Sequence, residues 1–273
     1  MKRILKFIYG VVPFKKKIFL FIKKFWTPKE SIYKHLHFET PFTVKIDDSK
    51  AFKLLNGTRI ENEIFWEGLT GKWEKESMKL WIELTKNSNS IFDIGANNGV
   101  YALVGKTMNP SAQVFAFEPH PVFFKNLKEN VNLNGYEIEL HKTAVSNING
   151  LLNIEDYTGH TPTITVEAVT LDAFIKSNQL QNVDLLKIDV ETFEPQVIEG
   201  FITALNLYKP TLLIEVLNEN VAEAINNHVK DLGYLYFNID ELTGIRRTQQ
   251  VEKSDFYNYL ICQEDVAKRI GIL

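Results

Sequence analysis

Hydrophobic and polar residues after position 74 form blocks that predict strands and helices in alternation. Five apolar runs predict strands, at 91–93, 113–117, 137–141, 184–189 and 211–216. Helical periodicity predicts helices at 74–84, 100–108, 121–134, 171–176, 195–206 and 219–232. Two last runs, 234–239 and 256–262, predict an antiparallel end to the sheet. This order predicts an α/β fold with a mostly parallel, seven-stranded sheet covered by helices on both faces.

The first 88 residues have a different pattern. Residues 42–46 and 51–55 predict a hairpin, and 28–41 a linker. Before them, apolar residues recur in alternating steps of three and four, which predicts a helical stripe of Ile4, Phe7, Val11, Phe14, Ile18, Phe21 and Phe25. Gly10 and Pro13 are expected to divide the stripe into two short helices. We therefore expect three segments: 1–40, 41–88 and a main domain at 89–273.

Charge separates the N-terminus from the rest of the chain. Residues 1–30 hold nine Lys or Arg and one acid, so the remainder carries 22 bases against 33 acids, a net charge of −11. The acidic main body excludes nucleic acid as a partner, whereas the basic aromatic stripe is typical of a helix at a membrane interface. A helix that packs on its own domain or on a second subunit satisfies the same pattern. Both interpretations stay open for residues 1–27: a peripheral membrane contact, or packing on the chain's own domain or in a homo-oligomer.

Acids end four of the predicted parallel strands, at Asp93, Glu118, Asp189 and Glu215, so the chemistry is expected at the carboxyl edge of the sheet. Asp93-Ile-Gly-Ala-Asn-Asn-Gly99 follows one strand, and Glu118 ends the next. The glycines allow a tight turn close to a ligand, and Glu118 is placed to accept hydrogen bonds from both hydroxyls of a ribose. Asn97 stands where a dinucleotide fingerprint requires its second glycine, which disfavours a nicotinamide cofactor.

An ordered set of motifs resembles the FkbM family of S-adenosylmethionine-dependent methyltransferases over residues 70–262. The set is Asp93–Gly99, Phe117-Glu118-Pro119, Ala144-Val145-Ser146, Thr170-Leu171-Asp172, Lys187-Ile188-Asp189-Val190-Glu191, Glu194, Gly200 and Ile214-Glu215-Val216. The resemblance implies a Rossmann-like class I fold and S-adenosyl-L-methionine as the cofactor. It assigns the cofactor site to Glu74, Asp93, Gly95, Asn97, Gly99, Glu118, Ser146 and Asp189.

Within that resemblance, Asp189 and Glu191 face the region of methyl transfer as a base or a ligand for the acceptor hydroxyl, with Glu215 as a third candidate. Asp93 is expected to hold the glycine turn and the methionine amino group, and Ser146 to lie against the adenine. Simpler structural roles remain open: a helix cap for Asp93, Glu74 or Asp189, and a turn hydroxyl for Ser146. His120 is interpreted as a surface loop residue. No metal is assigned.

Two positions depart from the family pattern. Thr192 replaces the usual glycine after Asp-Val-Glu, and Leu217 replaces a frequent histidine that is a candidate base. The sequence still predicts an O-methyltransferase that acts on a hydroxyl of a sugar, glycan or polyol-like natural product, with a lipid-linked acceptor favoured. The alternatives are a methyltransferase-like scaffold that docks on a membrane or partner, and a nicotinamide oxidoreductase.

The single cysteine, Cys262, fits a reducing compartment, so we expect a cytoplasmic enzyme on the inner membrane face.

Overall fold

The protein divides into two compact units, which are described separately. The structure, a computed structural model, describes residues 14–156 and 162–273. The first unit ends at Trp73, and the second runs from Glu74 to Leu273. The expected segment boundaries at 40/41 and 88/89 stay a prediction, and the first half of the expected stripe lies outside the described residues.

The first unit is a small α+β fold with an aromatic core. Its elements are α2 (Lys15–Lys23), α3 (Glu30–Tyr33), the antiparallel hairpin β1 (Pro41–Lys45) and β2 (Ala51–Leu55), and α4 (Arg59–Glu67). The hairpin confirms the alternation at 42–46 and 51–55. The core rings pack edge to face, for example Phe38 on Phe65 with centroids 4.7 Å apart.

The expected linker at 28–41 is wrong. The segment contains α3, and its residues Tyr33 and Phe38 are buried in the aromatic core. Helix α4 was not predicted either, although Thr58-x-x-Glu61 is a capping-box signal. Thr58 N donates to Glu61 Oε2 at 2.8 Å, and the Thr58 side chain accepts from the third helical amide.

The second unit contains an eight-stranded sheet in the order β12-β11-β13-β10-β9-β3-β4-β5. Five neighbouring strands are parallel: β10 (Thr211–Glu215), β9 (Leu185–Ile188), β3 (Ser90–Ile94), β4 (Gln113–Phe117) and β5 (Glu139–His141). Strand β13 (Asn258–Cys262) pairs antiparallel with β10 and with β11 (Leu235–Asp240). The expected antiparallel end is confirmed. The eighth strand, β12 (Gly244–Thr248), is an exposed edge whose residues Gly244-Ile-Arg-Arg-Thr248 give little hydrophobic signal.

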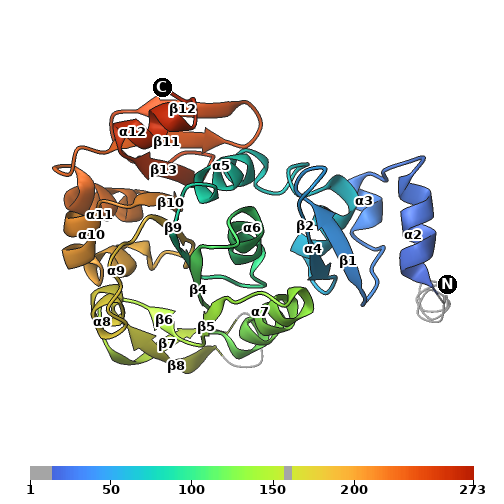
Figure 1. Ribbon diagram of the computed structural model, residues 1–273, viewed down its shortest axis with the longest axis horizontal. Helices are drawn as coiled ribbons and strands as arrows, with labels where there is room; N and C mark the ends of the chain where they lie inside the picture. The colour runs from blue at the N-terminus through green and yellow to red at the C-terminus, as the bar shows by residue number, and fades with distance from the viewer. Residues whose placement is uncertain (1–13, 157–161) are drawn as a thin grey trace. The chain divides into compact units, whose positions relative to one another are not determined.

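Helices cover both faces of this sheet (Figure 1). One face carries α5 (Lys75–Thr85), α6 (Val100–Met108) and α7 (Pro121–Asn134), and the other α8 (Leu171–Ser177), α9 (Glu194–Glu199), α10 (Ile202–Tyr208) and α11 (Glu219–Val229). The single helix expected at 195–206 is divided, because the chain leaves the helix at Gly200 and Phe201. A last helix, α12 (Glu264–Arg269), was not predicted.

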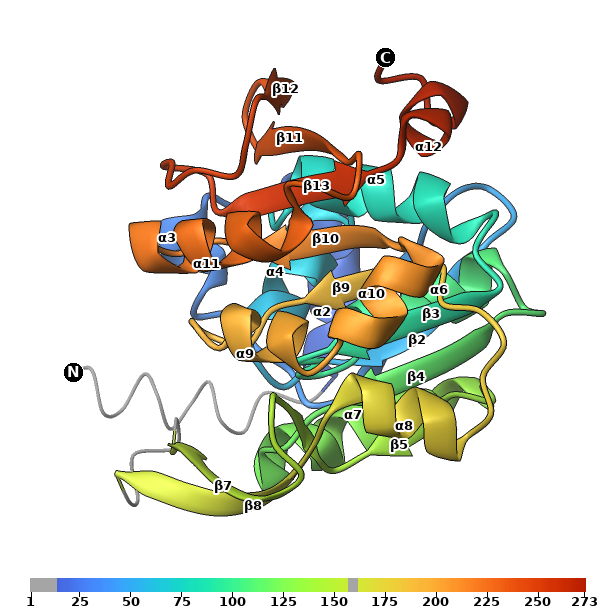
Figure 2. The same cartoon turned by 90° about the vertical axis from the view of Figure 1, so that its left-hand side faces the viewer.

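A three-stranded sheet lies beside the edge strand β5 (Figure 2). Its order is β6-β8-β7, from β6 (Ala144–Val145), β8 (Thr163–Val169) and β7 (Gly150–Glu155). The sequence indicates short β runs at 147–169, of which 164–169 is the clearest, and β8 confirms that run. Ile164, Val166 and Ala168 alternate with polar residues in β8 and pack with Leu152 and Ile154 of β7.

The parallel order and the crossover helices are those of a Rossmann-like fold, as expected. Ligands of such sheets bind outside the carboxyl ends of the strands. No helix of residues 14–156 and 162–273 is long and apolar enough to cross a membrane.

Candidate active site

Four acidic residues gather at the carboxyl edge of the parallel sheet. Asp93, Glu118, Asp189 and Glu215 lie at the ends of β3, β4, β9 and β10, which are neighbours in the sheet. The register aligns Ile94 with both Phe117 and Ile188, so the residues that follow emerge at one level. The sequence predicted this grouping, because parallel strands end at the same edge.

A glycine turn brings the backbone of β3 against that of β9. Gly95 has a φ of +81°, and a Cβ there would lie 1.8 Å from the carbonyl oxygen of Asp189. Only glycine fits this approach. The amides of Gly95 and Ala96 both donate to the Phe117 carbonyl, at 3.0 and 2.9 Å. Gly99, with a φ of +87°, then begins α6.

Glu118 is buried and held by two backbone amides. Asn97 N donates to Oε2 and His120 N to Oε1, each at 2.8 Å. Burial raises the pKa of Glu118 to about 7, although both amides act in the opposite direction. Each carboxylate oxygen has a second lone pair for a further donor. A carboxylate with two fixed oxygens suits a pair of neighbouring hydroxyls, as on a ribose.

Asp93 makes the helix-cap contact that was the simpler of its two interpretations. Its Oδ2 accepts from Ala102 N at 2.9 Å, in the first turn of α6. Burial raises its pKa to about 7. Its expected contact with a cofactor amino group stays a prediction.

Asp189 pairs with a buried lysine that sequence reasoning missed. Lys187 Nζ lies 3.1 Å from Asp189 Oδ2, and the lysine side chain is 1% exposed against 31% for the aspartate. The same ammonium lies 5.2 Å from the ring centroid of Tyr101, a cation–π distance. Burial alone would lower the pKa of Lys187, but the carboxylates of Asp189, Glu74 and Glu215 raise it above its ordinary value. A charged residue in the apolar run Leu185–Ile188 was the signal available.

Glu74 and Glu215 complete the surroundings of Lys187. Glu74 lies at the N-terminus of α5, but its carboxylate accepts from the Tyr101 hydroxyl instead of capping the helix. Burial raises its pKa to about 7. Burial, followed by the charge of Asp189, raises the pKa of Glu215 to about 9. A pKa above neutrality favours the protonated form of Glu215 at neutral pH, which opposes its candidacy as a base.

The turn after Asp189 has an unusual backbone. Glu191 and Thr192 have φ values of +54° and +80°. A β-branched residue in this region is strained, so Thr192 occupies a conformation suited to the glycine that the family usually has. Glu191 lies exposed in this turn, and partial desolvation followed by the charge of Asp189 raises its pKa.

Glu194 stabilises the same turn from the start of α9. Its Oε1 accepts from Val190 N at 3.0 Å. Its Oε2 is buried without a hydrogen-bond partner in the part of the chain that the structure describes. Burial raises its pKa to about 7. Asp189 does not cap α9, whose N-cap residue is Phe193.

The interpretation of His120 as a surface loop residue is wrong. Its side chain is buried at the N-terminus of α7, where Nδ1 accepts from Val122 N at 3.3 Å and Nε2 lies 3.3 Å from Asp156 Oδ1. The sequence gives no signal that His120 is buried, because apolar residues after Pro121 are typical of the start of any helix. Ser146 is buried beyond β6, with its amide donating to Val169 O at 3.0 Å, and its adenine contact stays a prediction.

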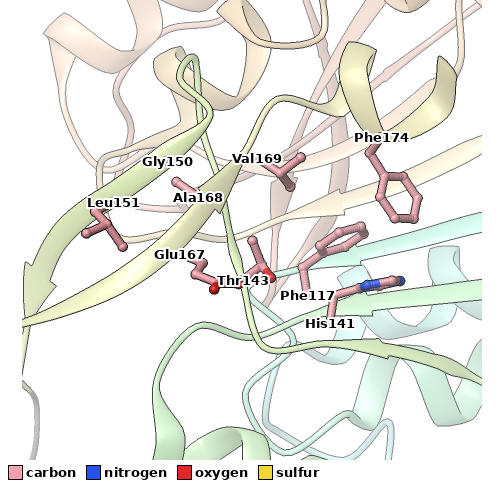
Figure 3. A pocket seen from close by; sticks show the side chains of 9 residues that line it. All are labelled: Phe117, His141, Thr143, Gly150, Leu151, Glu167, Ala168, Val169 and Phe174. Carbon is pink, nitrogen blue, oxygen red and sulfur yellow. The ribbon is translucent and has the colours of Figure 1, made fainter. Parts of the chain in front are cut away.

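A separate cavity of about 410 Å³ lies between the edge of the main sheet and the three-stranded sheet (Figure 3). The rings of Phe117, His141 and Phe174 gather on one side of it, with Glu167 and Thr143 nearby. None of the four strand-end acids lines it. Residues 14–156 and 162–273 contain no group of three or more His, Cys, Asp or Glu arranged to hold a metal ion.

Comparison with known proteins points to one family. A profile of the methyltransferase FkbM domain matches residues 93–236, just over half of the chain. The chain is 26% identical over 152 residues to hexuronic acid methyltransferase AglP of Haloferax volcanii, covering 52% of this chain and 62% of AglP. It is 27% identical over 144 residues to the 2-O-methyltransferase NoeI of Sinorhizobium fredii, covering 43% of this chain and 59% of NoeI. The alignments thus span less than two thirds of these relatives.

Among solved structures, a methyltransferase FkbM from Methylobacillus flagellatus KT aligns with a TM-score of 0.42 and 15% identity. The alignment covers 64% of this chain and 43% of that chain.

Thr192→Gly should stabilise the protein. Glycine removes the strain of a positive φ, about 1–2 kcal/mol, at a cost of about 0.5–1 kcal/mol in chain entropy. Urea denaturation should show a net gain of up to about 1.5 kcal/mol. Thr192→Ala, which keeps the strained backbone, should show no such gain. Loss of stability in the glycine variant would mean that the threonine side chain is required at this turn.

Glu194→Gln tests the burial of an acid beside the site. The native Glu194 pKa is raised to about 7 from an ordinary 4.5, so the folded state binds more protons than the unfolded state between these values. Stability contributed by protonated Glu194 is full below about pH 4.5 and is lost as pH rises toward 7. Glutamine does not ionise, so the variant should gain about 1–3 kcal/mol relative to wild type across this window. A constant difference in unfolding free energy between pH 4.5 and 7.5 would contradict the raised pKa.

Proposed function

This chain belongs to the methyltransferase FkbM domain family, and we propose that it transfers a methyl group to a hydroxyl of a sugar or polyol-like acceptor. The cofactor of the family is S-adenosylmethionine. The observation that carries the proposal is the ring of strand-end acids: Glu118 is fixed by two amides on one side, and Asp189 is partly exposed beside a buried lysine on the other. The printed names of AglP and NoeI, a hexuronic acid methyltransferase and a 2-O-methyltransferase, support a sugar oxygen as the acceptor.

The residues present fit S-adenosylmethionine. Glu118 offers two oriented carboxylate oxygens to the ribose hydroxyls, at the point where the Gly95–Gly99 turn leads into the N-terminus of α6. The backbone N–H of Asn97, and not its side chain, donates to Glu118. Glu74, Asp93 and Ser146 stay as expected further contacts of the methionine end and the adenine.

When bound, the cofactor supplies an electrophilic methyl group on a sulfonium. The protein must align an acceptor oxygen for in-line attack and remove its proton. Lys187 Nζ donates to Oδ2 of Asp189, so Oδ1 is the oxygen that accepts the proton from the acceptor hydroxyl. The raised pKa of Glu215 disfavours it as a proton acceptor at neutral pH, and Glu191 orients the sugar. Asp189 is therefore the proposed base, which compensates for Leu217 in place of the frequent histidine.

Two other functions are distinguished by binding and turnover. A nicotinamide oxidoreductase would bind NAD in preference to S-adenosylmethionine, and calorimetry with both compounds separates the two. A catalytically altered scaffold would bind the cofactor without producing S-adenosylhomocysteine from a cell extract. We expect cofactor binding and product formation, in the cytoplasm.

Glu118→Ala should weaken S-adenosylmethionine binding by about 1.5–3 kcal/mol, because it removes charge-assisted hydrogen bonds to the ribose. Calorimetry measures the affinity, and far-ultraviolet circular dichroism checks the fold. Glu139→Ala is the matched control, since Glu139 is an exposed carboxylate of the neighbouring strand β5. Equal affinities for both folded variants would mean that the nucleotide binds elsewhere.

Asp189→Asn should keep cofactor affinity within about threefold but lower turnover by about 10²–10⁴, the range for loss of a general base. Glu191→Gln should mainly raise the Michaelis constant of the acceptor, because an orienting contact is lost. Steady-state kinetics with a sugar acceptor measure both. Near-normal turnover in both variants would assign these acids a structural role and leave positioning alone to drive the transfer.

A further inference from the structure

Helix α2 presents charged residues to its own unit and apolar residues to solvent. Phe19 is buried, with ring centroids 6.1 Å from Phe38 and 5.6 Å from Trp66. On the same side Lys16 Nζ donates to the Pro41 carbonyl and Lys23 Nζ to the Phe65 carbonyl. One phenylalanine and two lysines therefore attach α2 to the first unit, which is the reverse of a usual amphipathic packing.

The opposite side of α2 is an apolar stripe at steps of four, three and four residues. Its members are exposed to 71% at Phe14, 42% at Ile18, 63% at Phe21 and 77% at Phe25. Phe21 and Phe25 contact each other edge to face, with centroids 5.3 Å apart. These four residues, called the α2 stripe below, are the described half of the stripe expected from the sequence. The fold of the first unit does not need them, because Phe19 makes the packing contact.

The charge around the α2 stripe has one sign. Residues 14–29 contain six lysines and no acid. Lys17 and Lys24 are exposed on the helix surface, and Lys17 Nζ lies 5.2 Å from the Phe14 ring centroid. The remainder of the chain after residue 30 is strongly acidic. The stripe therefore suits a partner that is negatively charged at its surface and apolar just beneath it.

We propose that the α2 stripe inserts into the interface of an anionic lipid bilayer. Phenylalanine and isoleucine side chains would enter the acyl boundary while Lys17 and Lys24 meet the lipid phosphates. Nine residues span about 14 Å, so α2 lies along the surface of a hydrocarbon core about 30 Å thick and does not cross it.

Two other partners fit less well. A second copy of the chain would bring identical lysine clusters together across the stripe, and their repulsion opposes a dimer. A nucleic acid would use the lysines but would leave Ile18 and the edge-to-face phenylalanines without a matching surface. The bilayer satisfies both the apolar and the charged residues. This inference does not depend on the proposed methyl transfer, but a surface-bound enzyme would meet lipid-attached acceptors at a raised local concentration.

The test is co-sedimentation of the full chain with vesicles of phosphatidylglycerol and of phosphatidylcholine. We expect binding to the anionic vesicles that falls steeply between about 50 and 300 mM salt, because the lysines act through a screened surface potential. Phe21→Ser with Phe25→Ser should weaken partitioning about tenfold or more, since two rings leave the acyl boundary. Lys17→Glu with Lys24→Glu should weaken it about 25-fold or more, from about fivefold per lysine removed.

Matched controls isolate the surface. Leu242→Ser removes an apolar residue that is 79% exposed in the second unit, and Lys128→Glu with Lys176→Glu changes exposed charge to the same extent elsewhere. Both should bind vesicles as wild type does. Point substitutions are preferred to deletion of residues 1–27, because deletion also removes Phe19 from the aromatic core.

Three results would overturn the inference. The first is no binding to anionic vesicles by a folded wild-type chain. The second is self-association in analytical ultracentrifugation that the phenylalanine substitutions abolish, which would assign the stripe to a dimer. The third is binding to RNA that the lysine substitutions abolish and the phenylalanine substitutions leave intact.

Discussion

The site depends on the pairing of the buried Lys187 ammonium with the carboxylates around it. The ammonium is enclosed in the second unit at the ends of β9 and β10, where Asp189, Glu74 and Glu215 surround one positive charge. Three carboxylates and one ammonium cannot all be charged at low cost in a buried space. The result is a division of roles: Asp189 forms the ion pair, while burial and the charge of Asp189 raise the pKa of Glu215 to about 9. One lysine thus separates the proposed base, Asp189, from the neighbouring acids.

Close backbone contacts between the ends of neighbouring strands, rather than long flexible loops, bring these groups together. The Gly95 turn touches the Asp189 carbonyl, and its neighbour Asn97 orients Glu118. Glu118, the proposed ribose ligand, and Asp189, the proposed base, are therefore joined through one strand-to-strand contact. A change in the turn after β9, such as that at Thr192, is expected to reach Glu118 as well.

Local signals explain how far the sequence alone could predict this arrangement. The helix at 121–134 was predicted to the residue, because Pro121 starts it and Gly135 ends it in a left-handed conformation. The strand-end acids followed from the parallel order. Other features depend on tertiary contacts that no local pattern shows. His120 is buried at the start of α7, and Lys187 is buried where the carboxylates of Glu74 and Glu215, from other elements, act on it together with Asp189. Which face of α2 turns inward was equally hidden, since Phe19 lay outside the predicted stripe.

The central claim is that one site at the strand ends holds both the nucleotide and the reacting oxygen. A crystal structure with S-adenosylhomocysteine tests it most directly. The account predicts ribose hydroxyls about 2.7 Å from the Glu118 carboxylate oxygens and the sulfur on the Asp189 side of the glycine turn. Density for the nucleotide in the aromatic cavity of Phe117, His141 and Phe174, or against Glu118 with the sulfur directed away from Asp189, would contradict it.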